Sequence, residues 1–492
     1  MTSLRKNYIL SLISQTVTVL SPLIVTPFVA RRLLADNIGI FSFTESVVFI
    51  FGLFALLGSH TYGQREIAYC QGNKRQQLQI FAEVFLASGI TTAVVLAGYI
   101  IFAAMQKQYQ LIYFIQIAEL IAFHWDITWF YQGKEDFKTL LYRNMLVKAL
   151  YIILVFLLIR DTGDLPVYVI LRVGTFLLGN MTLLFPVVYQ CFKENIRVSA
   201  GMLLPHIRKM IPLFLPQIAI QIYTVLDKTM IGVITRSPYQ NGCYEEAMKV
   251  IRVLMNFVGA AAGVLMPRIA SLHASGNQEE IGNKMFNGIR FVFLITLPMV
   301  FGIVVVAPVF MPWFLGPGFE DAIGILQILA GLLLLLGVGR ITGSCLLAVK
   351  EEKQYTRNVC IGAAVNFSLN LWLISCFQAM GAAIASLAAE LAVTLLMLYH
   401  CRKFLDFGKL VKCLLTYLLC SAAMYATLIT VKSRLYGDVL WQLLILAVTG
   451  MMIYGAGLLI IRDEIVLSMI KMIWKKRTNT DNTDNTDNTD NE

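Results

Sequence analysis

Long, continuous apolar runs dominate this chain and constrain its fold more than any other feature. Of its 492 residues, 58% are hydrophobic and only 14% are charged, a composition unlike that of soluble globular domains. A run of about 20 apolar residues can cross the hydrocarbon core of a bilayer as a helix. The runs are continuous and show no short alternating segments, which argues against a β-barrel. The sequence therefore predicts an all-α integral membrane protein.

Hydropathy windows predict about fourteen transmembrane helices, with bounds good to a few residues. The expected spans are 9–29, 39–59, 80–103, 110–131, 141–159, 166–190, 211–234, 246–267, 289–312, 322–347, 358–377, 380–400, 413–431 and 439–461. Lys and Arg are concentrated in the loops on the side shared by both termini, which places both ends in the cytoplasm. The first apolar run is of spanning length and has no small-residue cleavage site, so we expect it to remain as the first helix.

An internal repeat predicts how these helices are grouped. A shift of 203 residues places Gly39 on Gly242 and Arg65 on Arg268, and the loop segments 134–144 and 350–358 also match. Helices one to six and seven to twelve are therefore expected to form two pseudo-symmetric parallel repeats around a central cavity. The expected units are an N-lobe (1–200), a C-lobe (201–405), two further helices (406–461), and an amphipathic segment followed by a disordered Thr-Asp-Asn tail (462–492).

Seven cations lie inside apolar runs of spanning length: Lys148, Arg172, Lys228, Lys249, Arg252, Arg290 and Arg340. A cation at mid-helix costs roughly 2.5 to 3.5 kcal/mol on insertion scales, so seven would cost on the order of 20 kcal/mol unless they face water, partners or an anion. We expect Lys249 and Arg290, which are closer to helix ends, to snorkel to the head groups. The other five are candidates for a wet, cationic cavity in a membrane transporter.

Acidic residues in the spans have two open interpretations. Glu45, Glu119, Asp126, Asp227 and Glu390 either form a proton or Na⁺ relay that drives transport or neutralise buried cations by ion pairing. Asp227 and Lys228 are adjacent and point in different directions, so they cannot simply pair with one another.

Prolines mark equivalent positions of the two repeats. Pro22 and Pro27 in the first helix and Pro212 and Pro216 in the seventh are candidate hinges for alternating access, and packing is the alternative role.

Other chemistry finds no support in the sequence. The nine cysteines are scattered without a CxxC pair, so neither a metal site nor a disulfide framework is predicted. No Walker A, GxSxG or HExxH motif is present, so we expect no catalytic residues, no ATP and no cofactor other than a coupling ion. The net charge of +10 follows from the basic cytoplasmic loops and does not indicate nucleic-acid binding.

Several short motifs together carry a family resemblance. They are the segments 27–34, 39–43, 58–68, 129–137, 216–219, 226–228, 230–232 and 267–270. As a set, between about residues 7 and 400, they resemble Wzx-type polysaccharide flippases of the multidrug/oligosaccharidyl-lipid/polysaccharide (MOP) exporter superfamily. The resemblance implies two six-helix lobes and the movement of undecaprenyl-pyrophosphate-linked oligosaccharide across the bacterial inner membrane, for capsule, exopolysaccharide or O-antigen assembly. It also implies a polysaccharide polymerase and other assembly proteins as partners.

In related lipid II flippases, arginines of helices one, two and eight line the cavity. This chain offers Arg31 and Arg32 at the outer end of helix one and Arg252 in helix eight, but no arginine within helix two. A drug or cation antiporter of the same superfamily is an alternative, although its cavity should be acidic rather than basic. A membrane polymerase or ligase is a second alternative, although such enzymes usually carry a large external loop. A structural partner of the polymerase is a third.

Overall fold

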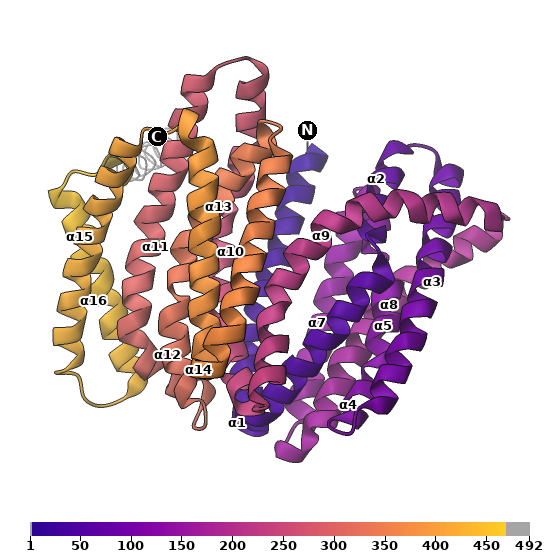
Figure 1. Cartoon of the computed structure of the whole chain (residues 1–492), viewed down its shortest axis with the longest axis horizontal. Helices are drawn as coiled ribbons and strands as arrows, with labels where there is room; N and C mark the ends of the chain where they lie inside the picture. The colour runs from indigo at the N-terminus through magenta and orange to yellow at the C-terminus, as the bar shows by residue number, and fades with distance from the viewer. Residues whose placement is uncertain (1, 469–492) are drawn as a thin grey trace, which may run out of the picture.

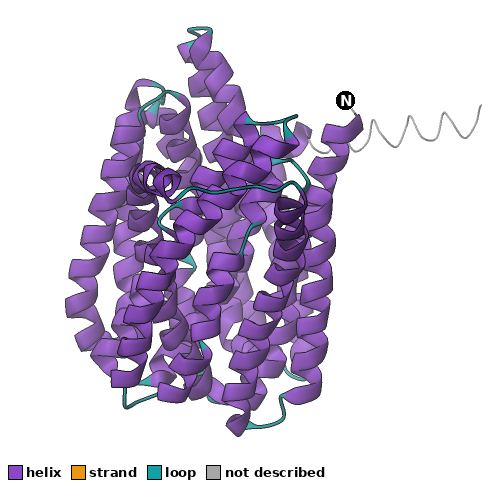
Figure 2. Ribbon diagram, turned by 90° about the vertical axis from the view of Figure 1, so that its right-hand side faces the viewer, coloured by secondary structure: helices purple, strands orange, loops and turns teal. Residues whose placement is uncertain are grey.

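The computed structural model describes residues 2–468, without the side chains of residues 2–20 and of positions 215–217, 219–220, 222–224, 257 and 260–264 in two long helices. Within this part of the chain every regular element is a helix (Figure 2). The elements are α1 Thr2–Leu56, α2 Ser59–Tyr69, α3 Lys74–Met105, α4 Gln110–Ile115, α5 Ile117–Trp125, α6 Thr128–Gly133, α7 Phe137–Leu158, the 3₁₀ helix η1 Thr162–Asp164, α8 Leu165–Lys193, α9 Ala200–Thr235, α10 Pro238–Ala274, α11 Gln278–Leu315, α12 Glu320–Leu329, α13 Gly331–Ala348, α14 Glu352–His400, η2 Cys401–Lys403, α15 Phe407–Lys432 and α16 Val439–Ile460. The all-α, multi-pass prediction is confirmed.

Ten segments among the described residues are long and apolar enough to cross a membrane. Two of them contain a sharp break: α1 turns at Leu34, where φ is 63°, and α14 turns at Gln378, where φ is 54°. The segment Glu352–Lys403 has 52 residues, or about 78 Å at 1.5 Å per residue, more than twice the ~30 Å hydrocarbon core. The predicted pairs 9–29 with 39–59 and 358–377 with 380–400 thus lie within single kinked helices. The total of fourteen spans stays a prediction.

Several helices extend beyond the predicted apolar windows on the side where α1 begins, which is the predicted cytoplasmic side. α9 begins at Ala200 and α11 at Gln278, eleven residues before the expected starts at 211 and 289. The apolar run of a membrane helix ends at the lipid boundary, whereas its helical backbone can continue into water until a capping residue ends it. Asn277 is such a cap, because its side chain accepts a hydrogen bond from the Glu280 backbone amide. The predicted span 110–131 is divided into α4, α5 and α6, and α2 was not predicted.

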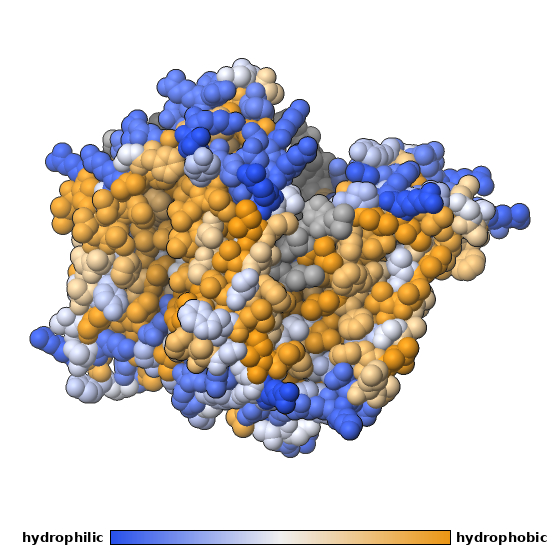
Figure 3. Space-filling model, in the orientation of Figure 1, coloured by the Kyte–Doolittle hydropathy of each residue, from blue (hydrophilic) through white to orange (hydrophobic). Residues whose placement is uncertain are grey.

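The helices form two groups joined by α1 and α9 (Figure 1). Helices α2 to α8 lie on the right of that view and α10 to α16 on the left, while α9 passes from the first group to the second. The space-filling view shows an apolar lateral surface between two polar edges, as a membrane-spanning protein requires (Figure 3). The limits of the lobes stay a prediction.

The two groups meet through glycines on the side opposite the predicted cytoplasmic side. A Cβ atom added to Gly39 of α1 would lie 1.8 Å from the Pro238 carbonyl oxygen, and one on Gly242 of α10 would lie 2.0 Å from the Ala35 carbonyl oxygen. Only glycine allows such backbone contact. These are the two glycines that the internal repeat aligns. The contact closes the space between the groups on this side of the molecule.

Candidate functional site

The central charged residues lie at one depth because of where their helices begin and end. Arg172 lies seven residues after the start of α8, Glu245 seven after the start of α10, and Lys228 seven before the end of α9. All three helix ends are on the side opposite the predicted cytoplasmic side. At 1.5 Å per residue, these side chains branch from the backbone about 10 Å inside the helix ends.

Five of the seven predicted cations are paired with carboxylates, and four of these lie in the central region. Arg172 of α8 contacts Glu45 of α1 at 2.8 Å. Lys228 of α9 and Arg252 of α10 both contact the same oxygen, Glu245 Oε2, at 2.6 and 2.8 Å. Lys249 contacts Glu246 Oε1 at 2.6 Å. We call these seven residues the central charge cluster.

The cluster connects the two helix groups electrostatically. Glu45 of α1 binds Arg172 of the first group and interacts with Glu245 of the second group. It also interacts with Lys228 of α9. With four cations against three carboxylates, the cluster retains one positive charge when all members are ionised. Arg172 and Arg252 are its exposed members, with side-chain exposures of 48% and 51%.

Two further predicted cavity cations do not join the ion pairs of the cluster. Lys148 of α7 is close enough to Arg172 to repel it and has no hydrogen-bond or ion-pair partner among the described side chains. Arg340 of α13 is exposed and lies against α10, where its guanidinium occupies the space that a Cβ on Gly259 would need. Glu390 of α14 interacts electrostatically with Arg340.

Asp227 lies in a separate buried network beside the cluster. Its carboxylate accepts hydrogen bonds from Tyr244 Oη at 2.6 Å, Asn370 Nδ2 at 2.7 Å and Ser386 Oγ. Asn370 also donates to Asn366 at 3.1 Å, and the Asn370 Oδ1 atom is buried without a hydrogen-bond partner. Asp227 and Lys228 do not pair with one another, as predicted. The network gathers oxygen atoms around a buried carboxylate, which is an arrangement suited to a proton or a hard monovalent cation.

The remaining acidic candidates lie elsewhere. Glu119 of α5 is 8% exposed and interacts electrostatically with Glu45, while its Oε2 atom has no hydrogen-bond partner. Asp126 follows α5 and accepts a hydrogen bond from the Thr128 backbone amide at 3.0 Å. Glu119 therefore borders the central charge cluster, whereas Asp126 organises a turn.

Arg31 and Arg32 occupy the break in α1 rather than the cluster. Arg31 donates to the Trp313 carbonyl of α11 at 2.5 Å, and Arg32 donates to the Arg160 carbonyl at 2.7 Å. They precede Leu34, whereas Glu45 follows it by eleven residues, or about 16 Å along the helix. Both arginines thus bind carbonyls at the closed end of the molecule.

The hinge candidates are placed only in part. Pro22 and Pro27 lie inside α1, and the sharp turn of that helix is at Leu34 instead. Pro212 is exposed on α9, and the side chain of Pro216 lies outside the described ones.

The prediction that Lys249 and Arg290 snorkel to the head groups is wrong for both. Lys249 is paired with Glu246, as described above. Arg290 of α11 is 16% exposed and contacts Asp463 at 2.8 Å and Glu464 at 2.9 Å. These carboxylates follow α16 and are far from Arg290 in sequence, so hydropathy could not identify them. Burial acts to raise the pKa of Asp463, but hydrogen bonds from Tyr417 and Arg290 outweigh it and hold the pKa below its usual value.

Sequence reasoning missed four residues of the cluster and of the Asp227 network: Glu245, Glu246, Tyr244 and Ser386. The predicted start of the eighth helix at 246 excluded Glu245 and Tyr244, whereas α10 begins at Pro238. A signal for the earlier start was present, because Ser237 is a good N-cap and Pro238 suits the first helical position. Glu245 and Arg252 are then seven residues apart, two turns along one face.

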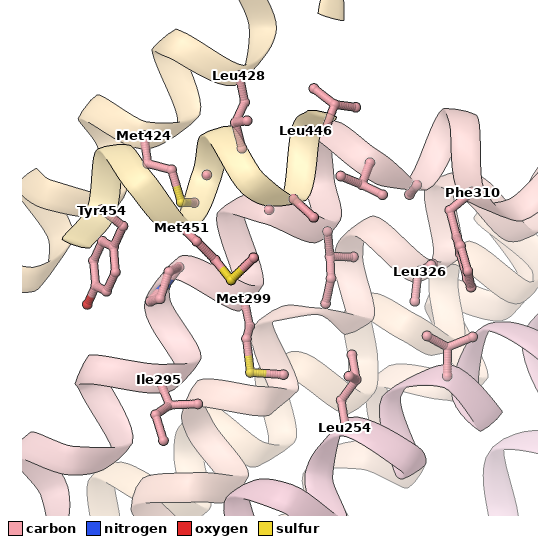
Figure 4. A pocket seen from close by; sticks show the side chains of 18 of the residues that line it. Leu254, Ile295, Met299, Phe310, Leu326, Met424, Leu428, Leu446, Met451 and Tyr454 are labelled. Atoms are coloured by element: carbon pink, nitrogen blue, oxygen red, sulfur yellow. The ribbon is translucent and has the colours of Figure 1, made fainter. Parts of the chain in front are cut away.

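An apolar cavity of about 780 Å³ borders α10. α11, α15 and α16 form most of its wall, and Val250 and Leu254 of α10 complete it. Met299 of α11 and Met451 of α16 point into the same space (Figure 4). Because α10 also carries Glu245 and Arg252, the same helix contributes to the charge cluster and to the cavity wall.

No group of metal-binding side chains occurs among the described residues.

The family model described as "Polysaccharide biosynthesis protein" matches residues 4–273, which is more than half of the chain. The chain belongs to this family. The resemblance to Wzx-type flippases of the MOP superfamily is thereby confirmed.

Curated relatives of this polysaccharide biosynthesis protein include the "Putative O-antigen transporter" of Escherichia coli K12. The two are 23% identical over 414 residues, covering 81% of this chain and 97% of the relative. The "Probable low-salt glycan biosynthesis flippase Agl15" of Haloferax volcanii is 27% identical over 260 residues, covering 51% of this chain and 54% of the relative. These relatives are named as a transporter and a flippase, in agreement with the prediction of a transporter rather than an enzyme.

Solved structures show the same fold. The lipid II flippase MurJ in an inward closed conformation has a TM-score of 0.77 at 16% identity, covering 93% of this chain and 100% of that chain. An inward-facing multidrug resistance transporter of the MATE family has a TM-score of 0.59 at 13% identity, covering 78% of this chain and 94% of that chain. The fold of this family member is therefore that of the MOP superfamily.

Proposed function

We propose that this protein moves an undecaprenyl-pyrophosphate-linked oligosaccharide from the inner to the outer leaflet of the bacterial cytoplasmic membrane by alternating access. The product would serve the assembly of capsule, exopolysaccharide or O-antigen, with a polymerase as a partner. The observation that supports this most is the central charge cluster, which holds more cations than carboxylates and exposes Arg172 and Arg252.

The chemistry of such a substrate fits the two environments that α10 borders. A pyrophosphate carries at least two negative charges, and charge-assisted hydrogen bonds of about 1.5 to 3 kcal/mol each from Lys and Arg would offset its dehydration. A polyprenyl tail needs an apolar surface, which the cavity beside α10 offers. The Gly39 and Gly242 contact closes the side opposite the predicted cytoplasmic side. The described conformation would thus receive substrate from the cytoplasmic side, with both termini in the cytoplasm.

We further propose that Na⁺ or a proton drives the cycle by binding at Asp227. Its carboxylate is buried among hydroxyl and amide groups, and the unpartnered Asn370 Oδ1 supplies a further oxygen. A cation there would neutralise a charge that has no cationic hydrogen-bond partner among the described side chains.

The experiment is a deletion strain complemented by the wild-type gene. We expect the deletion strain to accumulate lipid-linked repeat units accessible only from the cytoplasmic leaflet, and complementation to restore surface glycan. Susceptibility to organic cations such as ethidium should not change. Normal surface glycan in the deletion strain, or raised ethidium sensitivity alone, would favour the drug antiporter instead.

A further inference from the structure

Glu245 holds two cations with a single oxygen atom. Lys228 Nζ lies 2.6 Å and Arg252 Nη2 lies 2.8 Å from Glu245 Oε2. A carboxylate oxygen that accepts from both a lysine and an arginine occupies the position that a phosphate oxygen would take between the same two donors. Glu245 is therefore an internal anion already seated in a cationic site.

The site remains open to a second anion from one side. The side chains of Glu245 and Lys228 are 6% and 9% exposed, whereas that of Arg252 is 51% exposed. The described contacts of the Arg252 guanidinium use only Nη2, so other donors of its five remain available. An anion that enters the space between the helix groups would meet Arg252 first and Lys228 only after Glu245 has moved.

We propose that Glu245 is an exchangeable counter-ion that the diphosphate head group of the substrate displaces from Lys228 and Arg252, and that returns to them when the head group leaves. This inference rests on the proposed function. Its physical basis is that two cations without an anion would be costly in the empty transporter, because unpaired buried charge is destabilising. A competing carboxylate also prevents the head group from binding too tightly to be released.

The neighbouring residue provides a matched comparison. Glu246 is 1% exposed and, among the described side chains, pairs only with Lys249, through Oε1. Its Oε2 is buried without a hydrogen-bond partner in the same set. Replacing either glutamate with glutamine removes one negative charge from nearly the same place. Only the Glu245 substitution removes the shared ligand of Lys228 and Arg252.

The test is binding of farnesyl diphosphate to the purified full-length protein in lipid nanodiscs, measured by calorimetry for the wild type, Glu245→Gln and Glu246→Gln. We expect Glu245→Gln to bind about tenfold or more tightly, as loss of a competing charge-assisted contact implies, and Glu246→Gln to change affinity much less. In cells, Glu245→Gln should export glycan more slowly than the wild type at equal membrane abundance, because the head group is released late.

Other outcomes overturn the inference and are distinguishable from failure of the proposed function. Unchanged or weaker binding by Glu245→Gln, in a protein whose wild type exports glycan, would show that Glu245 does not compete with the head group. Equal tightening in both variants would point to general electrostatics instead. If Glu245→Gln does not fold, Glu245→Asp is the second variant. It should bind farnesyl diphosphate more tightly than the wild type, because the shorter carboxylate reaches Lys228 and Arg252 less well. Equal affinity would contradict the inference. If the wild-type protein moves no lipid-linked glycan, the proposed function itself is contradicted.

Discussion

Asp227 and Lys228 are consecutive residues of α9, and their side chains are held by Tyr244 and Glu245, which are consecutive residues of α10. Tyr244 Oη donates to Asp227 at 2.6 Å, and Lys228 contacts Glu245 at 2.6 Å. The proposed ion site and the proposed head-group site therefore share two helices and lie one residue apart on each. A change at one site must move the same backbone that positions the other, which provides a direct physical route for coupling.

The first prediction concerns this coupling. Asp227→Asn removes the charge that a coupling cation would neutralise, so flipping in proteoliposomes should lose its dependence on a Na⁺ or proton gradient. The control is Asp438→Asn, since Asp438 caps α16 by accepting from the Leu440 amide and asparagine caps equally well. A gradient response retained in full by Asp227→Asn would exclude this residue as the ion site.

The second prediction concerns the cations of the cluster. Lys228→Ala and Arg252→Ala should each lower glycan export by about tenfold or more, because each removes a charge-assisted contact to the head group. The control is Arg208→Ala, an exposed arginine on the predicted cytoplasmic half of α9. Surface glycan normalised to membrane abundance is the measurement, and wild-type levels in both cluster variants would contradict the proposed site.

The third prediction concerns the apolar cavity. Gly302 lines it, and a Cβ added there would meet no atom within 4 Å. Gly302→Leu should therefore place its side chain in the cavity and lower export of polyprenyl-linked substrate. Gly455→Leu is the matched control, because Gly455 also has free space but does not line the cavity. Equal export by the two variants would show that the cavity does not take the lipid tail.

The fourth prediction concerns closure between the helix groups. Gly39→Ala places a Cβ 1.8 Å from the Pro238 carbonyl oxygen, so the helices must separate at a cost of about 1 to 3 kcal/mol. The thermal unfolding midpoint should fall. Gly98→Ala on α3 meets no atom within 4 Å and should leave the midpoint unchanged or raise it slightly, since alanine favours helix. A midpoint unaffected by Gly39→Ala would mean that this contact is not close in solution.

The fifth prediction concerns the anchor of the C-terminal helices. The pKa of Asp463 lies below its usual value of 3.8, so its ionised form stabilises the fold at neutral pH, and this stabilisation is lost as pH falls through the folded-state pKa. Asp463→Asn should lower the unfolding midpoint at pH 7, and the difference from wild type should shrink only below about pH 4. Glu464→Gln is the control, because Glu464 is 85% exposed and exposed pairs contribute little.

Much of this protein follows from the sequence by itself. Continuous apolar runs determine an all-helical membrane protein, because lipid offers the backbone no hydrogen bonds and helices satisfy them internally. The motifs between residues 27 and 270 were sufficient to indicate the family. The different directions of Asp227 and Lys228 also followed from sequence, since adjacent residues of a helix diverge by about 100°.

Only the tertiary structure decided which charges meet. Arg172 and Glu45 are 127 residues apart, and Arg290 and Asp463 are 173 apart, so their pairing depends on how helices pack rather than on any local pattern. The sequence did not indicate Glu245 for a related reason. Hydropathy locates the lipid boundary, whereas α10 begins further out, at Pro238. A buried cation needs an anion wherever the fold can supply one, and the fold alone shows that Glu245 supplies it to Lys228 and Arg252.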